Sequence, residues 1–111
     1  MAFNRQLFDS INRKYKKAHD EITDLYYNQG KLSKEEFDIL HELVWLLHEK
    51  ERYDNGFYAD HELSEEILNS EEFQKNLQDR ISHLNKRIPE LQTLRMNKCK
   101  GFKYSFEKQT K

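Results

Sequence analysis

The chain of 111 residues contains only one cysteine, one proline and three glycines. The lone cysteine, Cys99, cannot form an internal disulfide, which fits a reducing compartment, and we expect a cytoplasmic protein. The glycines are isolated from one another, so no glycine-rich loop is available to cradle a phosphate. No run of about 18 apolar residues occurs, and polar residues 4–6 interrupt any apolar leader. We therefore predict neither a membrane-spanning helix nor a secretory signal.

Three apolar rows with helical spacing are the clearest positive signal. The rows are Phe8, Ile11, Tyr15, Ala18, Ile22 and Leu25; Phe37, Leu40, Val44 and Leu47; and Leu77, Ile81, Leu84, Ile88 and Leu91. Because residues three and four apart share one face of a helix, each row needs a partner to cover it. Gly30, Gly56 and Gly101 follow the rows, where a left-handed residue commonly ends a helix. We predict an all-α fold, a small antiparallel bundle of three main helices with coiled-coil-like seams and an optional short fourth helix.

Local signals place the first two helices. The first helix should extend from about residue 4 to residue 29. Ser33 and Glu36 have the spacing of a capping box, which begins a second helix that extends to about residue 53. Its apolar residues cover about half of its circumference, so we expect it to contact two neighbours at the centre of the bundle. Segment 53–58 has Asn-Gly between aromatic residues, and a helix end with a packed aromatic loop is favoured there over a hairpin turn.

Two alternatives remain open for residues 60–98. Either one helix continues throughout, or a short helix over 61–68 ends near Asn69 and a new helix follows. We favour the break, because Asn69 and Glu72 form a second potential capping box. Pro89 costs about 3 kcal/mol inside a helix, yet apolar residues continue the row beyond it. We therefore predict a kinked helix that ends near residue 98.

The end of the chain differs from the rest. We assign residues 1–98 to a single helical domain and residues 99–111 to a basic aromatic tail that is either flexible or docked. In the tail, Phe102, Tyr104 and Phe106 alternate with polar residues, which is a strand pattern, but no other strand is predicted to pair with it. The lysines of the tail, beside aromatic rings that belong to no predicted apolar row, could also bind single-stranded nucleic acid. We favour self-docking or disorder over that role.

We predict no catalytic site, no metal site and no cofactor. His41 and His48 share one face beside Trp45, but residues seven apart do not ligate one metal without further ligands. Trp45 also occupies the position of the second histidine in an H-E-x-x-H motif. We expect both histidines to be satisfied by neighbouring carboxylates. The carboxylates lie on exposed helix faces, where nothing raises their pKa toward that of a catalytic acid or base.

Charge is distributed unevenly, although the formal net charge is only −1. Residues 1–17 carry five basic side chains and one acid, residues 18–72 carry sixteen acids and four bases, and residues 95–111 carry six bases and one acid. Solubility alone does not require acids to cluster in one span, and we predict a partner-binding surface there. Its predicted residues are Asp60, Glu62, Glu65, Glu66, Glu71 and Glu72, with Tyr53, Phe57 and Tyr58 of an exposed aromatic loop.

These observations favour a non-enzymatic regulatory or inhibitory protein that binds another protein with a basic surface, through carboxylates that imitate nucleic acid. The composition, rich in lysine, asparagine and tyrosine, is typical of small accessory proteins of low-G+C bacteria or their phages. One alternative is a nucleic-acid-binding accessory protein that uses the basic N- and C-terminal segments. Another is a coiled-coil oligomerisation module. Because charged residues (35%) nearly equal apolar ones (36%), the core is thin, and a homodimer through the first helix is an option.

Overall fold

The computed structural model describes residues 3–108 and confirms an all-α fold. Helices make up 75% of the described residues, which contain no strand. The elements are α1 (Arg5–Thr23), a π-helical turn (Asp24–Asn28), α2 (Lys34–Asp54), α3 (Glu65–Leu68), α4 (Glu71–Lys98) and a 3-10 turn (Ser105–Glu107). No helix among the described residues carries an apolar stretch that would span a bilayer.

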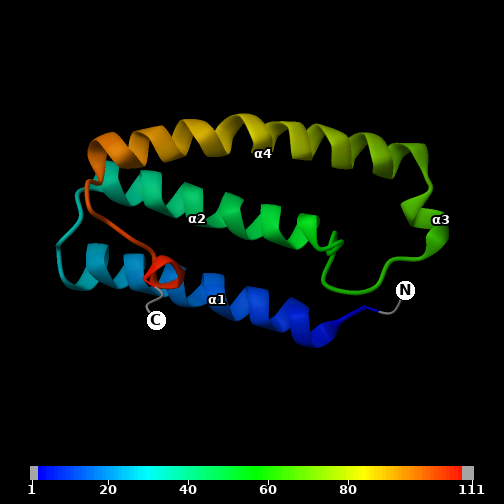
Figure 1. Cartoon of the computed structure of the whole chain (residues 1–111), viewed down its shortest axis with the longest axis horizontal. Coiled ribbons are helices and arrows are strands. Elements are labelled where there is room, and N and C mark those ends of the chain that lie inside the picture. Colours follow the sequence, from blue (N-terminus) through cyan, green and yellow to red (C-terminus); the bar gives the residue numbers. More distant parts are fainter. Residues whose placement is uncertain (1–2, 109–111) are drawn as a thin grey trace.

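The three long helices form an antiparallel bundle with α2 in the middle. Figure 1 shows α1, α2 and α4 side by side, with the chain reversing direction between consecutive long helices. Helix α2 packs against both α1 and α4, which confirms the central position that its wide apolar arc predicts. The bundle is elongated, 48 × 28 × 28 Å, so its two ends are well separated. The coiled-coil character of the seams stays a prediction.

Side-chain caps determine where the helices begin. The Asn4 side chain accepts a hydrogen bond from the amide three residues on and begins α1. The capping box of Ser33 and Glu36 is present at α2, as predicted. The break before α4 is also confirmed, but its cap is Ser70, whose hydroxyl accepts a hydrogen bond from the following turn. Asn69 instead ends α3, so the capping box predicted for Asn69 and Glu72 is wrong: Ser70 caps α4 alone, because Phe73 stands where a box needs an acid or amide.

The ends of α2 and α4 also agree with the signals in the sequence. Gly56 follows the end of α2 with a φ of +82°, a left-handed conformation that costs glycine little, and the next residue, Phe57, packs into the core. This confirms the helix end with a packed aromatic loop. Helix α4 continues through Pro89 to Lys98, as the apolar row beyond the proline predicted.

The core runs along the contacts of α2 with its two neighbours. The buried residues of α1 are the predicted Phe8, Ile11, Tyr15, Ala18 and Ile22, and those of α2 are Ile39, Leu40, Leu43, Val44 and Leu46. Helix α4 buries only Leu84, Ile88 and Leu91, while Leu77 and Ile81 of its predicted row are half-buried. The α1 stripe is covered within one chain, so a homodimer through α1 stays a prediction without a free apolar face to support it.

The described part of the C-terminal tail is docked on the bundle. Tyr104 is fully buried, and its hydroxyl donates a hydrogen bond to the Leu40 carbonyl oxygen at 2.7 Å. Figure 1 shows this segment returning from the end of α4 across the bundle to α1. The strand pattern of the tail is therefore not realised: its alternation places Tyr104 in the core and leaves Phe102 and Phe106 half-buried. Residues 109–111 of the predicted tail lie outside the described residues.

Candidate functional site: an acidic end with an apolar cleft

The acids of residues 18–72 divide into two groups in the folded chain. Members of the first group neutralise cations of the same molecule. Their pairs are Glu42 with Arg87 (2.8 Å), Glu49 with Arg80 (2.6 Å), Glu51 with Lys14 (2.8 Å) and Asp38 with Lys34 (2.8 Å). The first three join α2 to α4 or α1. These carboxylates are thus engaged with cations of the same chain.

The hydrogen bonds of this first group lower carboxylate pKa values. The Arg87 guanidinium holds the pKa of Glu42 below its usual value. Burial raises the pKa of Glu49, but hydrogen bonds from Arg80 and Tyr53 outweigh that effect and leave the pKa lowered. Both groups are therefore anionic at neutral pH and unsuited to act as general acids.

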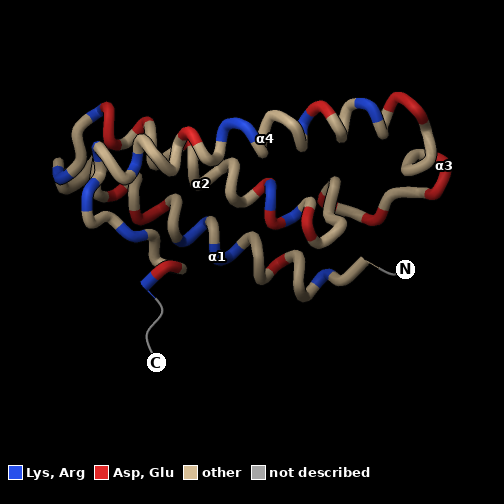
Figure 2. The backbone as a smooth tube through the Cα atoms, turned by 45° about the horizontal axis from the view of Figure 1, so that its top comes forward, with Lys and Arg blue, Asp and Glu red and all other residues tan. Residues whose placement is uncertain are grey.

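The second group of acids gathers at the α3 end of the bundle. It comprises Asp60, Glu62, Glu65, Glu66, Glu71 and Glu72, all of them exposed. Apart from the contact of Asp60 with His61, none of them has an ion pair among the described residues. No lysine or arginine occurs between Arg52 and Lys75. In Figure 2 the acids appear as red segments on the loop before α3, on α3 and at the start of α4, with tan but no blue between them. We call these six residues the acidic end.

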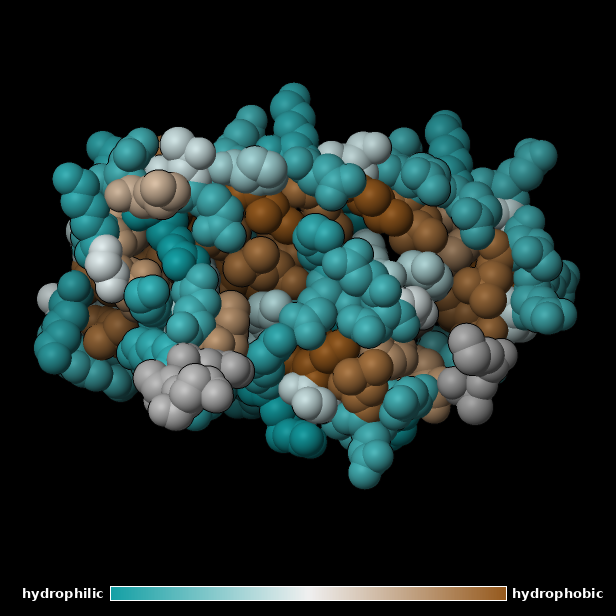
Figure 3. All heavy atoms as spheres, in the orientation of Figure 1, coloured by the Kyte–Doolittle hydropathy of each residue, from teal (hydrophilic) through white to brown (hydrophobic). Residues whose placement is uncertain are grey.

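A cleft of about 570 Å³ opens at the same end, between the start of α1, the loop after α2, and α3. Its apolar lining residues are Phe3, Leu7, Phe57, Leu63 and Leu68. Glu62 and Glu65 of the acidic end also line it. Leu7, which lines the cleft, is 40% exposed, and Ile67 of α3 is 45% exposed; both are among the few large apolar side chains left to solvent in the described residues. Figure 3 shows hydrophobic surface among hydrophilic side chains on one face of the molecule. The cleft thus combines apolar walls with acidic residues.

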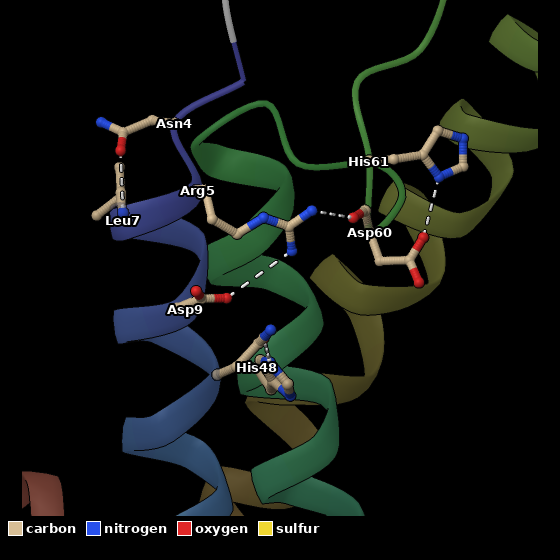
Figure 4. A network of polar contacts seen from close by, with 8 residues as sticks. Asn4, Arg5, Leu7, Asp9, His48, Asp60 and His61 are labelled. Carbon is tan, nitrogen blue, oxygen red and sulfur yellow. Dashed lines mark hydrogen bonds and ion pairs between the residues drawn. The ribbon is translucent and has the colours of Figure 1, made fainter.

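Arg5 joins the start of α1 to the loop before α3, at the same end of the bundle. Its guanidinium donates a hydrogen bond to the Asp60 carbonyl oxygen at 3.1 Å and lies 3.8 Å from the Asp9 carboxylate. Figure 4 shows Arg5 reaching from α1 to the loop before α3, while the Asp60 carboxylate turns away toward His61. The His61 ring lies 3.0 Å from that carboxylate, and its hydrogen bond lowers the pKa of Asp60. The loop is held at α1 without neutralising the acidic end.

The aromatic loop is not the exposed surface that we predicted. Phe57 is buried and packs against Phe3 and Phe8, with ring centroids 5.0 and 5.3 Å away. Apolar burial explains the correction, since three aromatic rings close the end of the core between α1 and the loop. Phe57 supports the wall of the cleft and presents little surface to a partner.

Tyr53 and Tyr58 are half-buried and also have structural contacts. The Tyr53 hydroxyl donates a hydrogen bond to Glu49 at 2.7 Å, and burial together with this carboxylate raises the pKa of Tyr53 to about 12. Tyr58 packs between Tyr53 and Phe73, with ring centroids 5.7 and 5.9 Å away. Of the three predicted aromatic residues, Phe57 and Tyr58 line the cleft.

A second concave region, which sequence reasoning missed, lies between α1 and α2. This groove has a volume of about 410 Å³ and is lined by Asn12, Tyr15, Lys16, His19, Asp20, Val44, Trp45 and His48. Trp45 is 48% exposed there. His41 accepts a hydrogen bond from the Trp45 indole at 3.2 Å, and His48 bonds Asn12 at 2.7 Å. The predicted carboxylate partners of these histidines are therefore wrong, because α1 brings an amide and a third histidine to this face of α2.

The described residues contain no group of three or more histidine, cysteine or acidic side chains placed to hold a metal ion. No protein-family model, no curated protein and no solved structure matches this chain significantly. The fold and the site therefore define a class only: a small antiparallel helical bundle with an acidic end beside an apolar cleft.

Proposed function

We propose that this protein is a non-enzymatic regulatory or inhibitory protein that binds a basic surface of another protein through its acidic end, in the cytoplasm. The observation that carries the proposal is the coincidence of six acids, none paired with a lysine or arginine, with an apolar cleft and two exposed aliphatic side chains. Unpaired charge attracts a partner over distance and increases its association rate. Apolar surface inside a polar rim supplies the contact area that holds the partner once bound.

Helix capping accounts for only part of this arrangement. Glu65 and Glu66 lie in the first turn of α3, and Glu71 and Glu72 lie in the first turn of α4. Acids at these positions stabilise a helix by about 0.3–1 kcal/mol through its dipole. That role does not explain why these acids have no ion pair with a lysine or arginine among the described residues, nor why Glu62 lies in the cleft outside a helix.

The nucleic-acid alternative has less support from the contacts. The tail rings that would stack on bases are engaged elsewhere: Tyr104 is in the core, and Phe106 packs on Tyr15 with ring centroids 4.9 Å apart. At the other terminus, Lys14 pairs with Glu51 and Lys16 pairs with Asp20. A basic surface without free aromatic rings retains only the phosphate contribution to binding.

Charge reversal at the acidic end tests the proposal directly. The probe is a synthetic amphipathic peptide of leucine and lysine, titrated by calorimetry against the parent and the triple variant Glu62→Lys, Glu65→Lys, Glu66→Lys. At roughly 0.5 kcal/mol for each exposed charge, the three reversals weaken binding about tenfold. Raising the salt concentration weakens parent binding and affects the variant much less, because the charges are then screened.

A matched control carries the same change in net charge at the opposite end of the bundle. The variant Asp20→Lys, Glu35→Lys, Asp38→Lys replaces three exposed acids of α1 and α2, one of them in the first turn of a helix. It should bind the peptide within about twofold of the parent. Equal weakening by both variants would mean that only net charge matters, and unchanged binding by the first variant would refute the proposed surface. Neutralising exposed Lys98, Lys100 and Lys103 to Gln should abolish retention on single-stranded DNA if the nucleic-acid alternative holds.

A further inference from the structure

Three histidines and the only tryptophan meet at the α1–α2 groove. The rings of His19 on α1 and His41 on α2 have centroids 5.0 Å apart, and His19 lies 5.2 Å from Trp45. The Trp45 indole Nε1 donates to His41 Nε2 at 3.2 Å. On the other side of Trp45, His48 stacks on Tyr15 at 5.1 Å. Aromatic and imidazole rings thus hold α1 against α2 along the groove.

The neutral form of His41 is required by this geometry. An indole nitrogen can only donate a hydrogen bond, so His41 Nε2 has to accept and therefore has to be unprotonated. A proton on Nε2 removes that acceptor and directs two donors at each other. It also places a cation beside His19, whose own Nδ1 lies 3.6 Å from the Asp20 carboxylate. When both imidazoles are charged, they repel across the seam between α1 and α2.

The charges around the two α2 histidines do not offset this effect. Burial and the neighbouring His19 lower the pKa of His41, although Asp38 on its own helix opposes the shift. Burial and Arg52 lower the pKa of His48, although Glu51 and Glu49 oppose the shift. The opposing glutamates are already engaged, Glu51 with Lys14 of α1 and Glu49 with Arg80 of α4, and Asp20 is engaged with Lys16. The pKa of each histidine is therefore below its ordinary value, so both are neutral at pH 7 and take up a proton only in acid.

We propose that the groove is an acid-sensitive device: protonation of His41 breaks the Trp45–His41 hydrogen bond, places a cation against His19 at the seam between α1 and α2 and releases the Trp45 side chain. Trp45 is already 48% exposed in the neutral protein, and the acid form presents the half of its surface that now packs against the seam. The bundle persists through this change, because the ion pairs of α2 rest on carboxylates with lowered pKa values. This device is independent of the acidic end and of its proposed partner.

Trp45 reports on the change because no other tryptophan is present. Its fluorescence emission is recorded from about pH 8 to about pH 5, together with acrylamide quenching at both extremes. A protonated imidazole can alter indole emission without any opening, so the accessibility measurement decides between the two. We expect the emission midpoint to lie below about 6.5, the ordinary histidine value. We expect the quenching constant to rise by at least about twofold in acid, while helical circular dichroism is unchanged.

Two histidine variants separate this device from general acid effects. His41→Gln keeps a neutral side chain that can accept a hydrogen bond, and it should remove most of the acid-induced rise in quenching. His83→Gln replaces an exposed histidine of α4 and should behave like the parent. An unchanged quenching constant in the parent would overturn the proposal, as would a full acid response in His41→Gln. Loss of helical circular dichroism in the parent over the same range would also overturn it, because the change would then be unfolding.

Discussion

Removal of the Tyr104 side chain tests whether the C-terminal segment belongs to the core. Tyr104 is fully buried, stacks on Phe106 with ring centroids 5.2 Å apart, and lies 5.1 Å beneath the Arg95 guanidinium. Deleting a buried aromatic side chain costs about 3–5 kcal/mol through lost transfer free energy and the cavity left behind. Tyr104→Ala should therefore lower the free energy of unfolding by that amount. Such a loss is a large share of the stability of a small domain.

A conservative variant isolates the hydrogen bond from the packing. Tyr104→Phe keeps the ring and removes only the hydroxyl that donates to the Leu40 carbonyl oxygen. A hydrogen bond of this kind contributes about 0.5–1.5 kcal/mol, so the Phe variant should lie well above the Ala variant in stability. Burial also keeps this hydroxyl protonated, because it raises the pKa of Tyr104 above its ordinary value.

The assay is urea denaturation followed by circular dichroism, with Tyr27→Ala as the matched control. Tyr27 is the same residue type, but it is 69% exposed, and its removal should change the free energy of unfolding by less than about 0.5 kcal/mol. If Tyr104→Ala unfolds at the same urea concentration as Tyr27→Ala, the segment is not docked and the reasoning fails.

Three further predictions concern α2. Leu43→Ala, at a fully buried position, should cost about 2–5 kcal/mol by urea denaturation, whereas half-buried Leu47→Ala should cost clearly less. Glu49→Ala should cost about 0.5–1.5 kcal/mol, because it removes the ion pair with Arg80 and the hydrogen bond from the Tyr53 hydroxyl; an unchanged free energy of unfolding would mean that these contacts do not stabilise the fold. The native pKa values of His41 and His48 are lowered, so the unfolded chain binds more protons than the folded chain just below pH 6.5. The melting temperature should therefore fall as the pH drops from about 7.5 to about 5.5. A constant melting temperature would contradict this.

The sequence by itself determined the helices, their order and the central place of α2. Those features depend on local patterns: apolar residues three and four apart, the capping box at Ser33, and a glycine after each apolar row. The same local reasoning located the break before α4 but misplaced its cap. Asn69 and Ser70 are both good capping residues, and the choice between them depends on how tightly the preceding turn closes.

Only the tertiary structure decided which charged and aromatic residues are free. A sequence shows sixteen acids in one span but not that Glu42, Glu49 and Glu51 face cations from α4 and α1 while the acidic end faces none. From the sequence, Phe57 is expected to be an exposed loop residue. In the folded chain, the start of α1 brings two aromatic rings against it and buries it. The histidine groove and the docking of Tyr104 likewise depend on residues more than twenty positions apart. Local periodicity carries no information about which helix face meets which neighbour, and that pairing is set by how all the apolar faces are buried together.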